Sequence, residues 1–385
     1  MGERSQVRTF ALCFYCSRIR FKPRRVLRAA FFVDMAKLVT VYRGNGFALD
    51  DMSGIRWLKI SEALARAGHR VEMAIRGNAA PLPPQPNLRR VELEHVKWND
   101  YDVVKTLFHH GFDVLEKYGG ATHPFIISKL GSVVGARDMN GIFFYGRTRS
   151  KLFATQNKIA RASKYVTVLS PQARALWHLS HGGDEKVLLV PGAVDAEIPP
   201  PTRDPYPQDR APRALFAGNI YDQHSQPHAN RVLVRKLNAL GKHLSARGIR
   251  LYMLGVGDVS RLENKYVTYL GAVHYEASWD YIHFANVGIV VSAGTFMHNN
   301  ESTKIYHYLR AGLPVVSEAG FPNDHVVRRA NLGFVVENGN IPNMAEHVER
   351  AVHASWNREH AIQYILAQHT WDKRVETYEQ ILRAV

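Results

Sequence analysis

The amino-acid sequence predicts an α/β protein made of two doubly wound domains that face each other across a cleft. Runs typical of strands alternate with helical runs over residues 37–198, a proline-rich stretch follows at 199–212, and a second alternating series begins at residue 213. With 385 residues, the chain is long enough to bury two full-sized cores. Its 46% hydrophobic and 22% charged residues are typical of a globular protein.

The first domain opens with a strand, a glycine loop, a helix and a second strand. Lys37–Tyr42 is β-rich, and the loop Gly44-Asn45-Gly46 follows it. Apolar residues then repeat at helical spacing over Ser53–Ala67, Gly68 ends that helix, and Val71–Ile75 is the next strand. This β-α-β unit is typical of a Rossmann-like domain, although no third glycine completes a dinucleotide fingerprint.

The same alternation predicts the rest of the first domain. We expect strands at Tyr101–Phe108, Gly141–Tyr145, Tyr165–Leu169 and Val187–Val190, and helices at Asp113–Tyr118, Pro124–Val134, Lys151–Ala162 and Pro171–Leu179. His109 and His110 follow the first of these strands, and Arg147 follows the second. Because ligands of open α/β sheets bind beyond the carboxyl ends of the strands, these side chains are candidates for a site.

The second domain begins after a linker that contains six prolines, which exclude regular structure. We expect strands at Arg213–Ala217, Arg250–Leu254, Val267–Leu270 and Val287–Val291, and helices at Asn230–Ala246 and Ser302–Ala311. Gly218-Asn219 and Gly255-Val256-Gly257 follow two of these strands. A last helical stripe is made by Trp371, Val375, Tyr378 and Leu382.

The most informative segment runs from Glu301 to Val316. Ser302 is placed to cap a short helix, whose buried stripe is Ile305, Tyr308 and Leu309. Ser302, Thr303 and Lys304 bring two hydroxyls and a cation to the first turn, where free N–H groups and the helix dipole attract anions. These groups suit a diphosphate.

This segment resembles the donor-site helix of GT-B glycosyltransferases, which follows a pattern like Lys-x-x-Glu-Tyr-Leu-Ala-x-Gly-x-Pro-Val-Val. The matching residues are Lys304, Tyr308, Leu309, Gly312, Pro314, Val315 and Val316. Pro191-Gly192-Ala193-Val194-Asp195 is similar to the phrase that closes the N-terminal domain of many such enzymes. The chain thus resembles divergent bacterial members related to the retaining group-1-like enzymes, over residues 37–385.

The resemblance implies an acceptor-binding domain at 37–198, a linker at 199–212, a nucleotide-sugar domain at 213–355 and helices at 356–385 that pack back. It implies transfer of a sugar from a nucleoside-diphosphate sugar, with UDP or GDP favoured, to a hydroxyl of a glycan, glycolipid or other acceptor. No metal or other cofactor is expected. The candidate donor-binding residues are Gly44, Gly46, Arg147, Gly218, Asn219, Gly257, Glu301, Ser302, Thr303, Lys304 and His307.

The candidate catalytic residues are His109, His110 and Asp138, because histidine and carboxylate side chains can take a proton from an acceptor hydroxyl. An inverting enzyme needs such a base and a retaining enzyme does not, so the stereochemistry stays open. The family's usual pair of glutamates is replaced by Asn299 and His307. We therefore expect His307 or Glu301 to contact the donor ribose.

The net charge of +16 favours anionic partners, which are nucleotide sugars, nucleic acid or an acidic membrane face, and it does not choose among them. Residues 1–36 form a basic leader, and three interpretations of it stay open. Translation starts at Met35, so that the leader is not part of the protein; the leader binds anionic lipid; or it is a disordered tail. The two cysteines, Cys13 and Cys16, indicate a reducing compartment. We expect a cytoplasmic protein with peripheral contact at the inner membrane face.

Two other classes of function remain open. The first is an inactive or non-catalytic basic protein on the same fold, although no recognised nucleic-acid motif is present. The second is a sugar-nucleotide epimerase, which would consume the donor without an acceptor. The acids of Asp100-Tyr101-Asp102 match a metal-binding D-x-D, but they precede a strand and fit a solvated turn. No metal site is therefore expected.

Overall fold

The computed structural model describes residues 35–43, 52–77, 81–135, 146–208, 210–224, 226–294, 297 and 299–383, without the side chains at 146, 147 and 184. Several expectations therefore lie outside the described residues. They are the leader up to residue 34 with its two cysteines, Gly44, Gly46, Asp138 and the strand expected at 141–145.

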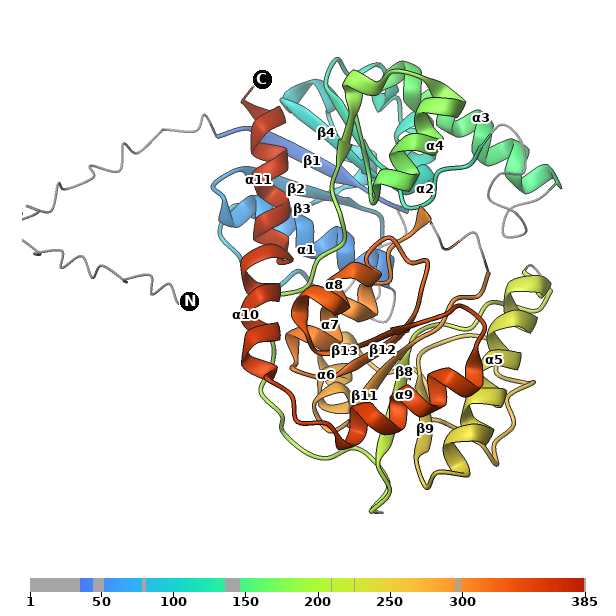
Figure 1. Cartoon of the computed structure of the whole chain (residues 1–385). Coiled ribbons are helices and arrows are strands. Elements are labelled where there is room, and N and C mark those ends of the chain that lie inside the picture. Colours follow the sequence, from blue (N-terminus) through green and yellow to red (C-terminus); the bar gives the residue numbers. More distant parts are fainter. Residues whose placement is uncertain are drawn as a thin grey trace, which may run out of the picture. The chain divides into compact units, whose positions relative to one another are not determined.

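The first sheet has seven parallel strands in the order β3-β2-β1-β4-β5-β6-β7 (Figure 1). These are β1 (Lys37–Val41), β2 (Arg70–Ile75), β3 (Leu88–Glu92), β4 (Val103–Leu107), β5 (Ile126–Lys129), β6 (Tyr165–Val168) and β7 (Val187–Leu189). Short 3₁₀ turns lie at Leu93–His95, Trp98–Asp100, Gly120–Thr122 and Asp184–Lys186. We call this sheet and its helices the first lobe.

Helices cover both faces of the first sheet, as expected for parallel strands with near-continuous apolar character. One face packs against α1 (Met52–Arg66) and α11 (Trp371–Leu382). The other face packs against α2 (Phe108–Lys117), α3 (Gly146–Ala162) and α4 (Pro171–His181). The last helix of the chain thus completes the core of the first lobe.

The second sheet has six parallel strands in the order β10-β9-β8-β11-β12-β13. These are β8 (Arg213–Ala217), β9 (Arg250–Leu254), β10 (Val267–Tyr269), β11 (Val287–Val290), β12 (Val315–Glu318) and β13 (Gly333–Val336). One face is covered by α5 (Pro227–Ser245) and α9 (Ile341–His353). The other is covered by α6 (Tyr275–His283), α7 (Thr303–Arg310), α8 (Asp324–Ala330) and α10 (Arg358–Gln368). This is the second lobe.

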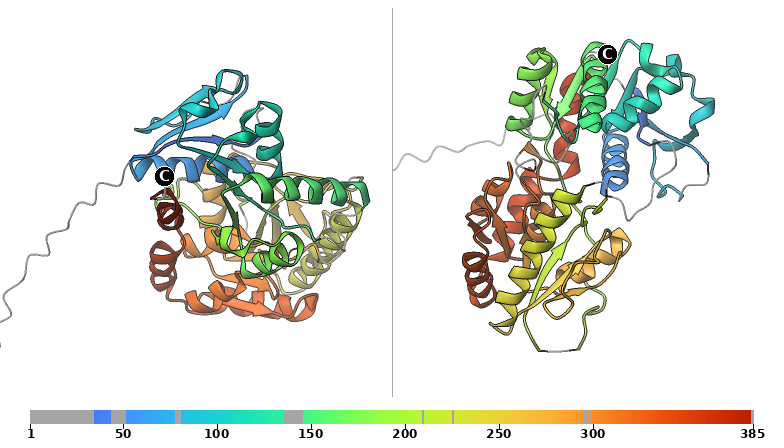
Figure 2. Two further views of the ribbon diagram at one scale, coloured as in Figure 1. Left: turned by 90° about the horizontal axis from the view of Figure 1, so that it is seen from above. Right: turned by 90° about the vertical axis from the view of Figure 1, so that its right-hand side faces the viewer.

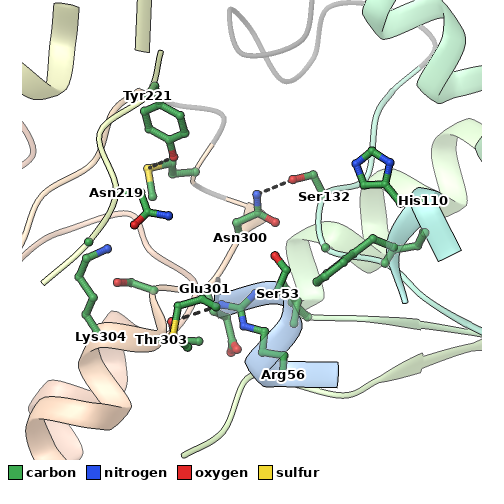
Figure 3. Close-up of a pocket in the computed structure, with 18 of the residues that line it drawn as sticks. Ser53, Arg56, His110, Ser132, Asn219, Tyr221, Asn300, Glu301, Thr303 and Lys304 are labelled. Atoms are coloured by element: carbon green, nitrogen blue, oxygen red, sulfur yellow. Dashed lines mark hydrogen bonds between the residues drawn. The ribbon is translucent and has the colours of Figure 1, made fainter. Parts of the chain in front are cut away.

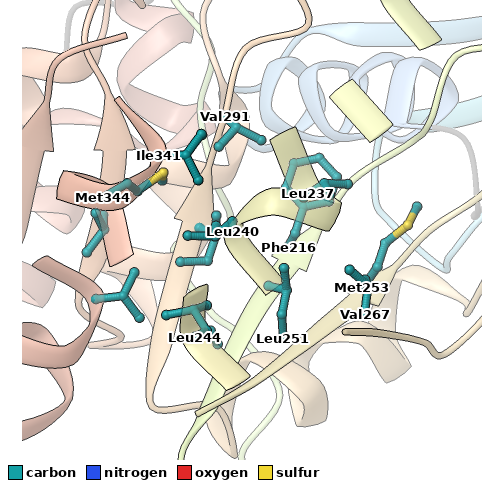
Figure 4. Packing of buried hydrophobic residues seen from close by; sticks show 14 of the residues in the cluster. Phe216, Leu237, Leu240, Leu244, Leu251, Met253, Val267, Val291, Ile341 and Met344 are labelled. Carbon is teal, nitrogen blue, oxygen red and sulfur yellow. The ribbon is translucent and has the colours of Figure 1, made fainter. Parts of the chain in front are cut away.

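The core under α5 shows how the second lobe is held. Leucines at helical spacing on α5 point at the sheet and meet side chains of β8, β9 and α9 (Figure 4). Leu237, Leu240 and Leu244 are fully buried there. The right-hand view of Figure 2 shows α5, in yellow, lying along this sheet. Burying such a side chain contributes about 2 kcal/mol, so the buried face of α5 is firmly anchored.

Strand order reverses at one point in each sheet. Sequential strands run outward from β1 to β3, and the chain then returns to place β4 on the other side of β1. The second sheet repeats this arrangement with β8 and β11. Ligands of doubly wound sheets bind in the crevice at such a switch point, beyond the carboxyl ends of the strands. Each lobe therefore offers a binding edge.

The chain crosses between the lobes twice, and the two crossings pair with each other. The Val194 N–H donates to the His369 carbonyl at 3.0 Å, and the Trp371 N–H donates to the Val194 carbonyl at 3.2 Å. Arg374 on α11 donates from Nε and Nη2 to the Gly192 carbonyl at 3.0 and 2.9 Å. A short parallel bridge therefore joins the lobes behind the cleft.

Several sequence-based expectations need correction. The helix expected at Pro124–Val134 is wrong, because Ile126–Lys129 is the buried strand β5. A short apolar run cannot be assigned by periodicity alone, and here pairing with β4 and β6 decides it. The sequence pattern did not predict the edge strand β3, because apolar and polar residues alternate only weakly along it.

The chain after β4 also differs from expectation. The strand ends at Leu107, and α2 begins at Phe108, whose φ of 57° turns the chain sharply. His109 and His110 therefore lie in the first turn of a helix. Arg147 likewise lies in the first turn of a helix, α3.

Two lysines are buried between the first sheet and α11. Lys105 on β4 has no exposed surface, and its ammonium lies 5.1 Å from the ring centroid of Tyr378. Its Nζ makes no hydrogen bond among the described residues. Burial lowers the pKa of Lys105 to about 7. Lys129 on β5 donates to the Val190 carbonyl at 3.1 Å, and burial lowers its pKa well below the usual value.

We predict that Lys105→Met stabilises the fold at pH 7 by on the order of a few kcal/mol. Between the folded pKa of about 7 and the unfolded value near 10.5, only the unfolded state binds this proton. Wild-type stability therefore rises with pH in that window, and the advantage of the variant shrinks toward pH 10.

Urea unfolding at several pH values measures this difference. The exposed Lys97 provides the control, because Lys97→Met should leave stability unchanged at every pH. A Lys105→Met effect that does not vary with pH would contradict the prediction.

Candidate functional site

A cavity of about 600 Å³ lies at the binding edges of both sheets. The first lobe contributes side chains after β1 and β4, the second lobe those after β8 and the start of α7 (Figure 3). Nine sequence-predicted residues line it: His109, His110, Gly218, Asn219, Glu301, Ser302, Thr303, Lys304 and His307.

The tenth described candidate, Gly257, does not line the cavity. Its φ is +131°, and a Cβ there would overlap the carbonyl oxygen of Ile220. The glycine lets the loops after β8 and β9 pair closely, with the Ile220 N–H donating to the Val256 carbonyl at 2.9 Å. Gly257 therefore shapes the binding edge of the second sheet without lining the cavity itself.

One hydroxyl at the start of α7 makes no hydrogen bond within the described part of the chain. Ser302 is the N-cap residue, as predicted, but its side chain makes no capping hydrogen bond. Asn323, fully buried, accepts from the Ser302 N–H at 3.0 Å and donates to its carbonyl at 2.9 Å. The Ser302 Oγ is buried, lines the cavity and makes no hydrogen bond among the described residues. A ligand that accepts a hydrogen bond would satisfy it.

Lys304 lies in a slot formed by β8 and its loop. Its Nζ is 5.0 Å from the ring centroid of Phe216, within cation–π range. A Cβ on Gly218 would lie 2.6 Å from this Nζ and overlap Cε. The lysine can therefore occupy the slot because residue 218 is glycine. Burial and the nearby Arg56 lower the pKa of Lys304 to about 8.

Arg56 is a cavity residue that the sequence analysis missed. It lies on α1 of the first lobe, and its Nη2 donates to the Thr303 Oγ1 of α7 at 3.2 Å (Figure 3). Two cations from opposite lobes thus lie close together. The periodicity of α1 drew attention to its buried neighbours, such as Trp57. The signal in the sequence that could have identified Arg56 was its place in the helix that follows the first glycine loop.

The charges that line the cavity are unbalanced. Arg43, Arg56 and Lys304 are lining cations, and Glu301 is the sole carboxylate among the described lining residues. That carboxylate accepts from the Gly192 N–H at 2.5 Å and from the Tyr306 hydroxyl at 3.0 Å. Because Glu301 is held by these groups, the cavity favours an anionic ligand.

Glu301 also links the cavity to the lobe crossings. Burial raises the pKa of its carboxyl. Its partner, the Gly192 peptide, has a carbonyl held by Arg374 of α11. The residues before Glu301 contact the first lobe as well, since the Asn300 Nδ2 donates to the Ser132 Oγ at 2.6 Å and the Ser170 hydroxyl donates to the Asn299 carbonyl at 2.9 Å. The loop before α7 is therefore anchored to both lobes.

His307 lies one turn into α7 with its ring stacked on Trp279, at a centroid distance of 5.3 Å. Its Nδ1–H donates to the Thr303 carbonyl at 2.8 Å, which leaves Nε2 as the acceptor of a neutral ring. Nε2 is 3.2 Å from the Tyr275 hydroxyl, which donates to Asp195 at 3.1 Å. Burial lowers the pKa of His307, so the neutral form dominates.

The histidine pair lies on the first-lobe side of the cavity. The rings of His109 and His110 are 3.9 Å apart between centroids. Burial, followed by the charges of His110, Arg43 and Lys151, lowers the pKa of His109 to about 4. His109 is therefore neutral near pH 7, and a neutral imidazole can accept a proton.

Comparisons with known proteins agree with this geometry. Residues 235–361 match the model of the glucosyltransferase 3-like C-terminal domain. No curated protein matches the chain. Sucrose-phosphate synthase from Thermosynechococcus elongatus is similar in structure, with a TM-score of 0.69 and 17% identity over 91% of this chain and 98% of that one.

Two further solved structures are similar. AviGT4, a glycosyltransferase involved in avilamycin A biosynthesis, has a TM-score of 0.61 and 18% identity over 90% of this chain and 97% of that one. Anabaena HepE in complex with UDP and glucose has a TM-score of 0.65 and 11% identity over 91% of this chain and 100% of that one.

This chain has the GT-B fold. At these identities the solved structures establish the fold alone, and the domain match, which covers less than half of the chain, is to a glucosyltransferase-like C-terminal domain. Among the described residues, no group of three or more His, Cys, Asp or Glu side chains could hold a metal ion. In the same part of the chain, no helix is long and apolar enough to cross a membrane.

We predict that Gly218→Ala weakens the binding of UDP or GDP roughly tenfold, because the new methyl group displaces the Lys304 ammonium from its slot. The clash is with the flexible end of a side chain, so the melting temperature without ligand should change little. Isothermal titration calorimetry measures the affinity.

A double-mutant cycle provides the control for this prediction. In a Lys304→Ala background, Gly218→Ala should have no further effect on affinity, since the displaced group is absent. Full additivity of the two substitutions would show that Gly218 acts on binding by another route.

Proposed function

We propose that this chain is a glycosyltransferase that moves a sugar from a UDP- or GDP-sugar to an acceptor hydroxyl without a metal ion. One observation carries the proposal: Arg56 and Lys304, from opposite lobes, meet at the first turn of α7 in the shared cavity. A leaving diphosphate needs positive charge where its own negative charge develops. These two cations, the free N–H groups of α7 and the Ser302 hydroxyl would supply it.

The proposed step forms one bond and breaks one. The acceptor oxygen bonds to the anomeric carbon of the donor sugar, and the bond from that carbon to the diphosphate oxygen breaks. The transition state has oxocarbenium character, as in glycoside hydrolysis. The electron pair leaves with the nucleoside diphosphate beside Lys304 and Arg56. The acceptor proton passes to a base or to the leaving phosphate.

The acceptor would enter from the first lobe. His109 and His110 line that side of the cavity, and burial together with nearby positive charges keeps His109 neutral. We propose His109 as the group that takes the proton in an inverting reaction. Asp138, Gly44, Gly46 and Arg147 remain predictions from the sequence, because their side chains or backbone lie outside the described residues.

The overall charge supports an anionic or lipid-linked acceptor in glycan, polysaccharide or glycolipid synthesis. A net charge of +16 attracts such acceptors, and also the acidic face of a cytoplasmic membrane. HepE was solved with UDP and glucose, and WaaG is a glycosyltransferase involved in lipopolysaccharide biosynthesis. By analogy of fold, HepE supports a nucleotide-sugar donor, and WaaG supports a glycan product.

We predict that Lys304→Ala lowers kcat roughly 10²- to 10³-fold, because one stabiliser of the leaving diphosphate is removed. The nucleotide-induced rise in melting temperature should also shrink. Turnover of a UDP-sugar and a GDP-sugar with a glycan acceptor, with and without EDTA, measures the effect, and EDTA should change nothing.

The exposed Lys164 supplies a matched control, since Lys164→Ala should keep full activity. Lys304→Arg should recover part of the rate because the charge is retained. The proposal fails if Lys304→Ala leaves both nucleotide binding and turnover intact. Donor consumption without any acceptor would instead indicate an epimerase.

The pH dependence of kcat/KM tests the role of His109. If its neutral ring accepts the proton, activity should fall with acid only near pH 4, below which the ring is already protonated. His109→Gln should lower the rate about 10²- to 10⁴-fold and remove this acid limb. An acid limb near pH 6.5, or full activity in His109→Gln, would exclude this role.

A further inference from the structure

A second cavity, of about 470 Å³, lies on the outer side of the second lobe. It runs between α5 and the segment that connects β9 to β10, and we call it the α5 groove. It shares no lining residue with the cavity between the lobes. The proposed transfer reaction makes no use of it.

The α5 groove is strongly basic. Its cations are Arg231, Arg235, Lys242, Arg261 and Lys265, all of them exposed, against one carboxylate, Glu263. Glu263 lies 3.6 Å from Lys265, and both side chains are about half exposed or more, so this ion pair contributes little. The other four cations have no ion pair among the described residues. Such a concentration of like charge costs free energy unless an anionic partner relieves it.

The groove is held in shape by its own hydrogen bonds. The Asn238 Nδ2 of α5 donates to the Arg261 carbonyl at 3.0 Å, and its Oδ1 accepts from the Glu263 N–H at 3.0 Å. The Tyr266 N–H donates to the Glu263 carbonyl at 2.8 Å. The opposite face of α5 is locked into the core by its leucines (Figure 4). The cations therefore stand on a preorganised framework, which lowers the entropy lost on binding.

The floor of the groove is partly apolar. Val234, Ala239 and Tyr266 line it between the cations, and the Lys265 ammonium lies 4.7 Å from the ring centroid of Tyr266. A sugar chain presents apolar C–H faces and, when acidic, carboxylate or phosphate groups along its length. Cations flanking an apolar floor complement both features of such a chain.

The shape of the α5 groove and the residues around it disfavour two other anionic partners, a lipid bilayer and single-stranded nucleic acid. A bilayer is flat, and the large hydrophobic side chains most exposed in the described part, Met35 and Leu179, lie outside the groove, so no apolar anchor is available there. Single-stranded nucleic acid binds by stacking successive bases on several aromatic rings, and Tyr266 is the sole aromatic residue lining this groove.

We propose that the α5 groove binds an anionic saccharide chain, which carries carboxylate or phosphate groups, separately from the catalytic cavity. Binding there requires no donor and no transfer. The groove would hold a charged stretch of glycan against the second lobe, and salt should weaken the complex because the contacts are between exposed charges.

The test uses the full chain and oligogalacturonate, an acidic oligosaccharide, with a neutral maltooligosaccharide as the uncharged probe. Arg235→Glu with Lys242→Glu reverses two groove charges. Arg161→Glu with Lys164→Glu reverses two exposed charges on and after α3 and changes the net charge equally. We expect the groove variant to bind oligogalacturonate about tenfold more weakly and the control variant to bind it like wild type.

Three outcomes would overturn the proposal. The first is an equal loss in both variants, which would mean that net charge alone drives binding. The second is binding of the neutral probe as tightly as the acidic one. The third is groove-dependent binding of single-stranded DNA or of phosphatidylglycerol vesicles that exceeds binding of oligogalacturonate, which would assign the groove to another partner.

The test stands apart from the proposed transfer reaction. The UDP-induced shift in melting temperature, measured on the same variants, should match wild type because no cavity residue is altered. Loss of oligogalacturonate binding with an intact UDP shift supports the groove alone. Failure of both UDP and GDP to bind wild type would reject the proposed donor and leave the groove result valid.

Discussion

The peptide of Gly192 is held on both sides, and the arrangement of the site depends on it. The Glu301 carboxylate accepts its N–H, and the Arg374 guanidinium donates to its carbonyl. Glu301 directly precedes the start of α7, and Arg374 belongs to the helix that completes the core of the first lobe. A Cβ at position 192 would lie 3.1 Å from Glu301 and 3.2 Å from Tyr306, so this close approach favours glycine. The crossing between the lobes thus sets where α7 begins.

Cations outnumber carboxylates among the described residues that line the cavity. In the cavity, Arg56 and Lys304 lie near each other, and the single lining carboxylate is engaged by backbone and hydroxyl groups. The repulsion between the two cations, together with burial, disfavours positive charge in the site when no ligand is bound. An anionic ligand reverses that penalty, which is a physical reason for such a site to bind a diphosphate. The buried Lys105 shows the same penalty without a ligand to relieve it.

Local pattern was enough to predict most elements of both sheets, and it failed where pairing decides. The run at 126–129 is short and apolar, and it becomes a strand because β4 and β6 lie on either side of it. The Ser302 cap was predicted from residue type, yet its side chain makes no capping hydrogen bond, and Asn323, 21 residues later, holds the backbone N–H and carbonyl of Ser302. A side chain that arrives from another loop cannot be read from local sequence. The Ser302 hydroxyl lines the cavity instead of capping α7.

By itself, the sequence determined the two α/β domains, the proline-rich linker and the motif around Lys304, because periodicity, glycines and prolines act on the backbone within a few residues. Only the tertiary structure decided which groups meet. Arg56 and Thr303 are 247 positions apart and touch across the cavity, and Gly192 and Glu301 are 109 positions apart. Contacts of that separation depend on how two lobes close on each other, and no local spacing encodes them. The motif at the start of α7 was therefore recognisable from its residues, whereas the second cation and the contacts of Glu301 required the fold.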